Sequence, residues 1–254
     1  MTPQISIVAP TLNEEGNIRF LLESIGKQTF ANAEIVVVDG GSTDETIPIA
    51  ESYRAKVIVE KGLKEFPSRN IGAKVASGEI LLFTCADVIF PRDLLERIKE
   101  NFRDKQLVAI TGPDIPSTSP MAKLEYGLYN FLRLVFSWLP GQTKRFSTST
   151  NFLAVKKMYF DKTGGFIPDV NGDGLMGRKL SELGKVKFSM DTKVFISPRR
   201  FQKMGFFKFN LHYLYVFENF FPSLYKTSFL KTLKKRSEAI HSNMRVTEGT
   251  PASQ

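Results

Sequence analysis

The chain of 254 residues has almost none of the side chains that build disulfide frameworks or cysteine-based zinc sites. Cys85 is its only cysteine, so an internal disulfide is excluded and nothing requires an oxidising compartment. The two histidines, His212 and His241, stand apart in the sequence and make poor metal ligands. The length allows one large domain, or a domain with an extension.

Long hydrophobic runs are missing as well. An aromatic-rich stretch, residues 206–221, is interrupted by charged and polar side chains and is shorter than the roughly 20 residues that span a bilayer. The first apolar strand begins at Ile5 without a basic stretch before it, which argues against a secretory leader. We therefore expect a cytoplasmic protein.

Aromatic and basic residues are abundant in the second half and leave two interpretations open. The chain has 22 phenylalanines, many of them between Phe131 and Phe229 among lysines and arginines. One interpretation is a buried helix or a dimer contact. The other is a helix resting in the headgroup layer, which would place the protein peripherally on the inner face of the cell membrane.

Acidic residues are outnumbered, at 26 against 35 lysines and arginines, and the net charge is +9. Such a balance favours anionic partners such as nucleotides or phospholipid surfaces, although it can also serve solubility alone. The basic residues are spread along the chain and form no motif that reads nucleic acid, so we expect no nucleic-acid partner.

Strand and helix patterns alternate through the first half of the chain. Strand patterns cover residues 5–9, 34–38, 56–59, 80–84 and 107–110, with helical patterns between them. Asn13 is the expected N-cap of the first helix, and Ser42 opens an expected capping box for the second. The alternation predicts an α/β fold with a mostly parallel sheet flanked by helices.

The second half is less regular. A helical stripe of apolar side chains occupies residues 120–139 and comprises Leu124, Leu128, Phe131, Leu132, Val135, Phe136 and Leu139. We expect one domain over residues 1–200 and a C-terminal aromatic and basic helical extension over residues 201–254. The last dozen residues of that extension are polar and are predicted to be disordered.

Acidic side chains follow two of the apolar strands. Asp39 ends the second strand, Asp87 follows the fourth, and Asp173 lies much later between two glycines. Ligands of open α/β sheets bind at the carboxyl ends of the strands, so acids there indicate a site for a metal ion, a sugar or a ribose. Asp39 also suits a turn and Asp87 a helix cap, which are structural alternatives.

Four ordered motifs resemble the opening of the family 2 glycosyltransferases, which have the GT-A fold. They lie at residues 8–15, 37–46, 69–73 and 76–83. The resemblance covers roughly residues 4 to 200. It implies a hexosyltransferase that moves a sugar from a nucleoside-diphosphate sugar to a glycan or lipid-linked acceptor, with inversion.

The resemblance places the nucleotide contacts on the first two motifs. Pro10, Leu12 and Glu14 belong to this rim, although Glu14 equally suits the first turn of a helix. Asp39 would accept hydrogen bonds from a base or a ribose, because an ionised carboxylate only accepts.

Cationic side chains are expected near the donor phosphates. Arg69 begins a helix and could reach the diphosphate or the base. Lys61 and Lys64 are alternatives, although surface lysines are usually only solvated. Arg199 and Arg200 follow the last strand, where the family places a basic or aromatic motif, and they could stabilise the leaving group; a solvated basic turn is the alternative.

Asp87 is the predicted ligand of Mg²⁺ or Mn²⁺. The family holds its ion with a pair of acids separated by one residue, but the triplet here is Cys85-Ala86-Asp87 and lacks the first acid. Since Mg²⁺ takes one or two carboxylates plus phosphates and waters, one acid can suffice. Cys85 is expected to be a small buried residue and not a nucleophile.

Asp173 is the predicted general base. The family has an acidic pair before a helix on the acceptor side; Gly172 stands in place of the first acid and Asp173 matches the second. The reaction needs one acid that takes the proton of the acceptor hydroxyl. A loop aspartate that stabilises a turn is the alternative.

Two other functions compete with this interpretation. A sugar nucleotidyltransferase would carry a glycine- and lysine-rich loop after the first strand, and residues 10–15 have none. A non-catalytic nucleotide-sugar-binding protein would explain the missing acids at Cys85 and Gly172. The sequence argues against a nicotinamide dehydrogenase, because no glycine fingerprint follows the first strand.

Overall fold

A computed structural model describes residues 3–117, 120–139, 147–168 and 172–197. The expected C-terminal extension (residues 201–254), its boundary at residue 200, and Arg199 and Arg200 lie outside these ranges. Within the described ranges, no helix combines the length and the apolar character that crossing a bilayer demands.

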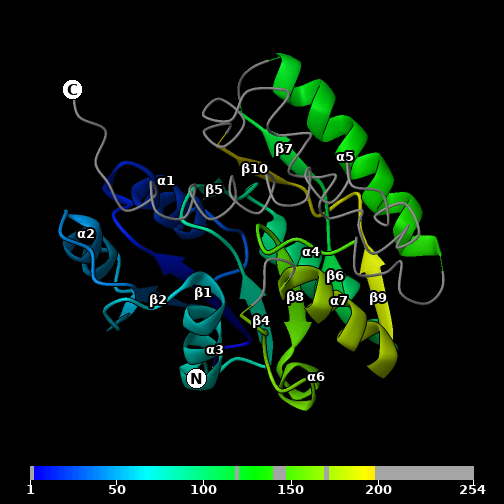
Figure 1. The fold of residues 1–254 in the computed structure, drawn as a ribbon, viewed down its shortest axis with the longest axis horizontal. Coiled ribbons are helices and arrows are strands. Elements are labelled where there is room, and N and C mark those ends of the chain that lie inside the picture. The colour runs from blue at the N-terminus through cyan, green and yellow to red at the C-terminus, as the bar shows by residue number, and fades with distance from the viewer. Residues whose placement is uncertain (1–2, 118–119, 140–146, 169–171, 198–254) are drawn as a thin grey trace, which may run out of the picture. The chain divides into compact units, whose positions relative to one another are not determined.

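The core of the domain is a seven-stranded sheet (Figure 1). Its strands are β1 (Ile5–Thr11), β2 (Ala33–Asp39), β3 (Lys56–Val59), β4 (Ile80–Phe83), β6 (Leu107–Thr111), β8 (Leu153–Lys156) and β9 (Lys185–Phe188). The order is β3-β2-β1-β4-β8-β6-β9, and β8 alone runs antiparallel to its two neighbours in this sheet. The predicted mostly parallel α/β sheet is confirmed.

Helices cover both faces of this sheet. They are α1 (Glu15–Gly26), α2 (Thr46–Ser52), α3 (Glu65–Val75), α4 (Leu94–Asn101), α6 (Lys157–Lys162) and α7 (Gly172–Leu183). Side chains of α1 and α2 form one apolar cluster with Val37, whereas those of α3, α6 and α7 form another with Val36 and Val38. The two clusters lie on opposite faces because side chains alternate along a strand.

A small second sheet stands beside the first. It has the order β5 (Val88–Ile89), β10 (Val194–Ile196) and β7 (Asp114–Pro116), and α5 (Pro120–Trp138) packs on β7 and β9. The N–H of Ser117 donates to the carbonyl of Ile196 (3.0 Å), so the start of α5 lies next to the end of β10. The N–H of Ser197 donates to the carbonyl of Asp87 (3.1 Å).

The helix predicted over residues 120–139 is confirmed, but much of its apolar stripe faces outward. Leu124, Leu128 and Phe131 are 73%, 62% and 59% exposed. The face that packs on the domain instead buries Asn130 and Arg133. Periodicity shows that one face of a helix is apolar, but it does not show which way that face points.

Gly72, inside α3, marks the closest approach of this helix to β1. A Cβ at this position would lie 2.3 Å from Cγ1 of Val8. We therefore expect Gly72→Ala to destabilise the protein by about 1–3 kcal/mol, because the methyl group fits only if helix and sheet separate. At Gly127, inside α5, no described atom lies within 4 Å of a Cβ.

Gly127→Ala is thus a matched control, which should stabilise the protein by about 0.5–1 kcal/mol through helix propensity alone. Chemical denaturation of both variants measures the difference. Equal midpoints would contradict the close approach at Gly72.

Candidate active site

The loops that follow β1 and β2 are fastened together around Asp39. This carboxylate is fully buried. Its Oδ1 accepts from the N–H groups of Gly41 (2.9 Å) and Ser42 (2.6 Å), and its Oδ2 accepts from the hydroxyls of Thr11 (2.8 Å) and Ser42 (2.6 Å). These bonds fill the roughly four acceptor positions of a carboxylate. Asp39 therefore holds the loop in its conformation. Its contact with a nucleoside stays a prediction, and it requires the nucleoside to replace one of these four hydrogen-bond donors.

Asn13 connects the same two loops. Its backbone is left-handed, with φ of 52°. Its N–H donates to Oγ of Ser42 (2.8 Å), and its Oδ1 accepts from the N–H of Thr43 (2.9 Å). The expected N-cap roles of Asn13 and Ser42 are wrong, because both side chains bind across to the neighbouring loop; α1 begins at Glu15 and α2 at Thr46.

Pro10, Leu12 and Glu14 lie at the carboxyl end of β1, where the rim was expected. Leu12 is 36% exposed, and the other two are half-buried. Nδ2 of Asn17 donates to Oε2 of Glu14 (2.7 Å), so Glu14 also supports the first turn of α1. Their contacts with a nucleotide stay predictions.

Arg69 has no exposed surface and joins three segments of the chain. Its Nη1 donates to the carbonyl of Thr84 (2.6 Å). Its Nη2 donates to Oε1 of Glu65 (2.8 Å), Sγ of Cys85 (3.2 Å) and the carbonyl of Thr150 (3.4 Å). The guanidinium thus holds the loop after β4 in place. Its Nε has no partner among the described residues, and a direct contact with the diphosphate or the base stays a prediction.

Asp87 lies half-buried on the loop between β4 and β5. Because β2, β1 and β4 are neighbours, Asp39 and Asp87 follow strands that are two positions apart, roughly 10 Å at the usual strand spacing. In the described part of the chain, no group of three or more histidine, cysteine or acidic side chains could hold a metal. This donor set fits Mg²⁺ or Mn²⁺ only if diphosphate oxygens and waters supply most of the ligands.

The thiol of Cys85, which lies on this same loop, is a poor nucleophile. Burial raises the pKa of Cys85 to about 12; the charges of Glu65 and Asp87 act in the same direction, and Arg69 opposes them. A neutral thiol is a poor nucleophile, so Cys85 contributes to the site as an acceptor for Arg69.

A buried polar segment before β8 connects the two halves of the site. We call residues 147–151 the linking segment. The hydroxyl of Thr150 lies 3.4 Å from Oε1 of Glu65, and the carbonyl of Asn151 accepts from the hydroxyl of Thr84 (3.0 Å). At its other end, the hydroxyl of Thr148 donates to the carbonyl of Asp173 (2.8 Å). This segment was not predicted to belong to the site. Its five uncharged polar residues in a row before an apolar strand could have indicated that it does.

Asp173 is the second residue of α7, and its carboxyl lies among charged groups. Although part of the residue is accessible to solvent, burial of the carboxyl raises the pKa of Asp173 to about 6. The charge of Glu65 adds to this rise, whereas the N–H of Gly174, which donates to Oδ1 (2.8 Å), and the charges of Arg133 and Arg69 oppose it. Such a carboxylate suits general-base work near neutral pH.

Two glycines of α7 let it approach the site closely. A Cβ on Gly172 would lie 2.7 Å from the carbonyl of Ile167 and from the ring of Phe66. A Cβ on Gly177 would lie 2.3 Å from the hydroxyl of Thr148. No side chain fits at position 172 in this packing, so the packing is matched to a glycine in place of the first acid of the expected pair.

A second buried ion pair supports the linking segment. Nη1 of Arg133 lies 3.3 Å from Oδ2 of Asp114, and both side chains are 1% exposed. Nε of Arg133 donates to the carbonyl of Ser147 (3.2 Å), while Ser149 and Asn151 donate to Oδ2 of Asp114 (3.1 Å each). This ion pair was not predicted, because no sequence motif indicates it.

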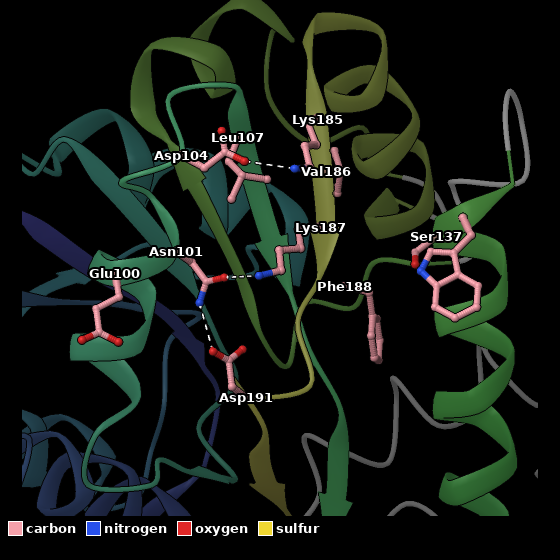
Figure 2. Close-up of a pocket in the computed structure, with 11 residues that line it drawn as sticks. Glu100, Asn101, Asp104, Leu107, Ser137, Lys185, Val186, Lys187, Phe188 and Asp191 are labelled. Atoms are coloured by element: carbon pink, nitrogen blue, oxygen red, sulfur yellow. Dashed lines mark hydrogen bonds and ion pairs between the residues drawn. The ribbon is translucent and has the colours of Figure 1, made fainter.

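A pocket of about 600 Å³ lies between the end of α4, β9 and the end of α5 (Figure 2). Lys185 is paired there with Asp104 (3.0 Å), and Nζ of Lys187 donates to Oδ1 of Asn101 (2.6 Å). None of the predicted site residues lines it. Because its lysines already have partners, we assign it no part in the chemistry.

Known proteins share this sequence pattern. The family model for glycosyl transferase family 2 matches residues 6–160. The poly(ribitol-phosphate) beta-N-acetylglucosaminyltransferase TarS of Staphylococcus aureus is 36% identical over 121 residues, which are 43% of this chain and 21% of that protein. A PGL/p-HBAD biosynthesis glycosyltransferase of Mycobacterium tuberculosis is 37% identical over 103 residues, 38% of this chain and 40% of that protein. The chain thus spans less than half the length of these relatives.

Solved structures share the fold. The mannosyltransferase PcManGT from Pyrobaculum calidifontis, in complex with GDP-Man and Mn²⁺, has a TM-score of 0.65 at 21% identity over 85% of this chain and 63% of its own. TarS in complex with UDP-GlcNAc has a TM-score of 0.60 at 19% identity over 84% of this chain and 66% of its own. The expected GT-A fold is confirmed.

The raised pKa of Asp173 makes the stability of the protein depend on pH. Because the folded-state pKa of about 6 exceeds the ordinary value, ionisation disfavours the folded state as the pH rises from about 4 through about 6. Asp173→Asn keeps an oxygen for the N–H of Gly174 and removes the charge. We expect it to be more stable than the wild type by on the order of 1–2 kcal/mol near pH 8.

Thermal denaturation at about pH 8 and about pH 4 measures this gain, which should shrink at the lower pH. A gain of the same size at both pH values would show that the carboxyl is not the cause.

Proposed function

The chain belongs to glycosyl transferase family 2, and on this premise we propose that it transfers a sugar from a nucleoside-diphosphate donor to an acceptor hydroxyl, with inversion. One observation carries the proposal. Arg69 holds the loop of Asp87 and also bonds the linking segment, whose Thr148 bonds Asp173. This connection suits a reaction that needs a base and a cation-binding carboxylate in fixed relation. The nucleotide sugars in the PcManGT and TarS complexes support it.

Asp173 is the proposed general base. It takes the proton of the acceptor hydroxyl while the hydroxyl oxygen attacks the anomeric carbon. A pKa of about 6 makes this carboxylate a stronger base than an ordinary aspartate and leaves it ionised at neutral pH. Attack from the side opposite the diphosphate inverts the anomeric carbon, and the diphosphate leaves with the electron pair of the broken bond.

Asp87 is the residue that would hold Mg²⁺ or Mn²⁺. When bound, such an ion offsets the negative charge of the leaving diphosphate. The structure supports a site with one protein carboxylate, in which phosphate oxygens and waters complete the ligand set. The Mn²⁺ in the PcManGT complex is in line with this assignment.

The nucleotide is proposed to lie on the rim formed by Pro10, Leu12, Glu14 and Asp39. Asp39 supports this rim through the loop that it fastens, and it reads the nucleoside if one of its hydroxyl donors gives way. Arg69 is proposed to lie in the wall of the site beside the phosphates of the donor. Arg199 and Arg200, outside the described residues, are proposed to meet the diphosphate.

We propose a glycan or a lipid-linked acceptor, with peripheral contact to an anionic membrane. Residues 198–254 contain 10 lysines and arginines but 3 acidic residues, and so hold seven of the nine net positive charges of the chain. Their many aromatic residues suit a lipid headgroup layer. Since no nucleic-acid-reading motif is present, we propose no nucleic-acid partner.

A non-catalytic nucleotide-sugar-binding protein is the alternative with a structural observation behind it. Position 172 has no room for a second acid beside Asp173, and Asp87 lacks its usual companion. Metal-dependent nucleotide binding without transfer to any of several acceptors would identify such a protein. Release of pyrophosphate from a nucleoside triphosphate and a sugar phosphate would instead identify a nucleotidyltransferase.

Asp87→Ala tests the metal assignment. UDP or GDP should raise the melting temperature of the wild type, and more so with Mn²⁺, because a ligand that binds only the folded state stabilises it. In Asp87→Ala the increment due to Mn²⁺ should vanish. Asp161→Ala, which removes an exposed carboxylate on α6, is the control and should keep it. An unchanged increment in Asp87→Ala would remove the assignment.

The pH dependence of transfer tests the base. Because Asp173 must be ionised to take a proton, kcat/KM should fall as the pH drops through about 6. Asp173→Asn should lose about a hundredfold to ten-thousandfold in turnover, with the UDP or GDP thermal shift unchanged. Near-normal turnover in this variant, measured with the acceptor that the wild type uses, would assign the base elsewhere.

A further inference from the structure

The outer face of α5 carries a continuous apolar stripe. Met121, Leu124, Leu128, Phe131 and Trp138 are 55%, 73%, 62%, 59% and 75% exposed. We call these five side chains the α5 stripe. Their spacing of three, four or seven residues puts them on one side of the helix, which borders β7 and β9 in Figure 1. Trp138, at the end of the helix, also lines the pocket between α4, β9 and α5. Contiguous exposed apolar patches of this kind mark interaction surfaces.

The buried face of α5 prevents the helix from turning the stripe inward. Nδ2 of Asn130 donates to the carbonyl of Asp114 (2.8 Å), and the N–H of Asp114 donates to Oδ1 of Asn130 (3.1 Å). Arg133 pairs with Asp114 and donates to the hydroxyl of Thr111 (2.8 Å). Rotation of the helix would separate a buried ion pair, which is strongly unfavourable. The stripe is therefore held outward.

The charge distribution identifies what covers the stripe. The start of α5 lies beside the end of β10, because the N–H of Ser117 donates to the carbonyl of Ile196. The chain leaves β10 there and continues into residues 198–254, which hold most of its net positive charge. An anionic bilayer attracts those charges and accepts the apolar side chains. A second copy of the chain would bring no charge complementary to those residues.

We propose that the α5 stripe docks the protein on the surface of an anionic lipid bilayer, with its five side chains in the boundary between headgroups and acyl chains. The proposal rests on the proposed function only for its purpose, which is to bring a lipid-linked acceptor to Asp173. The inner face of α5 reaches that side of the site, since Arg133 acts electrostatically on the Asp173 carboxyl.

Trp138 gives a direct test, because it is the only tryptophan in the chain. Vesicles of phosphatidylcholine and phosphatidylglycerol, added to the full chain, should shift its emission to shorter wavelength and carry the protein upward in a flotation gradient. Vesicles of phosphatidylcholine alone should bind less. Flotation without a change in Trp138 emission would mean that the basic segment binds by itself, and it would overturn the proposal.

Charged substitutions separate the stripe from other exposed apolar residues. Leu128→Glu and Phe131→Glu should each lower the partition onto the mixed vesicles by about tenfold, because a carboxylate opposes both burial in lipid and contact with anionic headgroups. Phe20→Glu on α1 is the matched control, since Phe20 is 54% exposed and lies outside the stripe. Its partition should equal that of the wild type. Equal partition of all three variants would overturn the proposal.

Two further measurements on the same samples keep the outcomes separate. Each variant should retain the melting temperature and the UDP or GDP thermal shift of the wild type. A wild type without any nucleotide shift rejects the proposed sugar transfer. A normal shift without vesicle binding rejects the α5 proposal and the proposed membrane contact, and leaves the proposed sugar transfer standing. A wild-type dimer that Leu128→Glu converts to a monomer, with no vesicle binding, would make the stripe a contact between two copies.

Discussion

A buried guanidinium is the constraint on which the arrangement of the site depends. Arg69 has no exposed surface, and a charge in such a position is tolerated only when the protein itself supplies its hydrogen-bond partners. The partners are Glu65, one turn earlier in α3, and the carbonyls of Thr84 and Thr150, which come from two distant parts of the sequence. Satisfying Arg69 therefore fixes α3, the loop of Asp87 and the linking segment relative to each other.

The linking segment carries this constraint across to the start of α7. Its Thr148 bonds the backbone of Asp173, Arg133 binds Ser147, and Asp114 binds Ser149 and Asn151. Opposing effects therefore act on the pKa of the Asp173 carboxyl. Burial and Glu65 raise its pKa, while Arg133 and Arg69 lower it. Burial has the largest effect, so the net result is a raised pKa. A carboxyl of intermediate pKa results from opposing effects and not from one specific contact.

Sequence patterns predicted the sheet because alternating strands and helices report local structure directly. They also singled out Asp39 and Asp87, since acids after apolar strands are visible in one dimension, whereas Asp173 was singled out by the family resemblance. They did not predict that Arg69 is enclosed, that Asn13 binds the neighbouring loop, or that residues 147–151 join the site. Each of these depends on partners that are distant in sequence, and no periodicity encodes such partners. The lack of room for a side chain at position 172 likewise depends on a distant partner, the ring of Phe66 in α3.

The orientation of α5 follows from the same electrostatic logic. Ordinary amphipathic packing would turn the apolar side chains of this helix inward. An unpaired buried carboxylate at Asp114 would be more unfavourable than exposed leucines, however, so Arg133 takes the inner face and the apolar stripe stays outside. Arg133 consequently has two effects: it sets the direction in which α5 faces, and it limits the rise in pKa of Asp173. Any displacement of α5 relative to β7 would change both, which couples the outer surface of this helix to the pKa of Asp173.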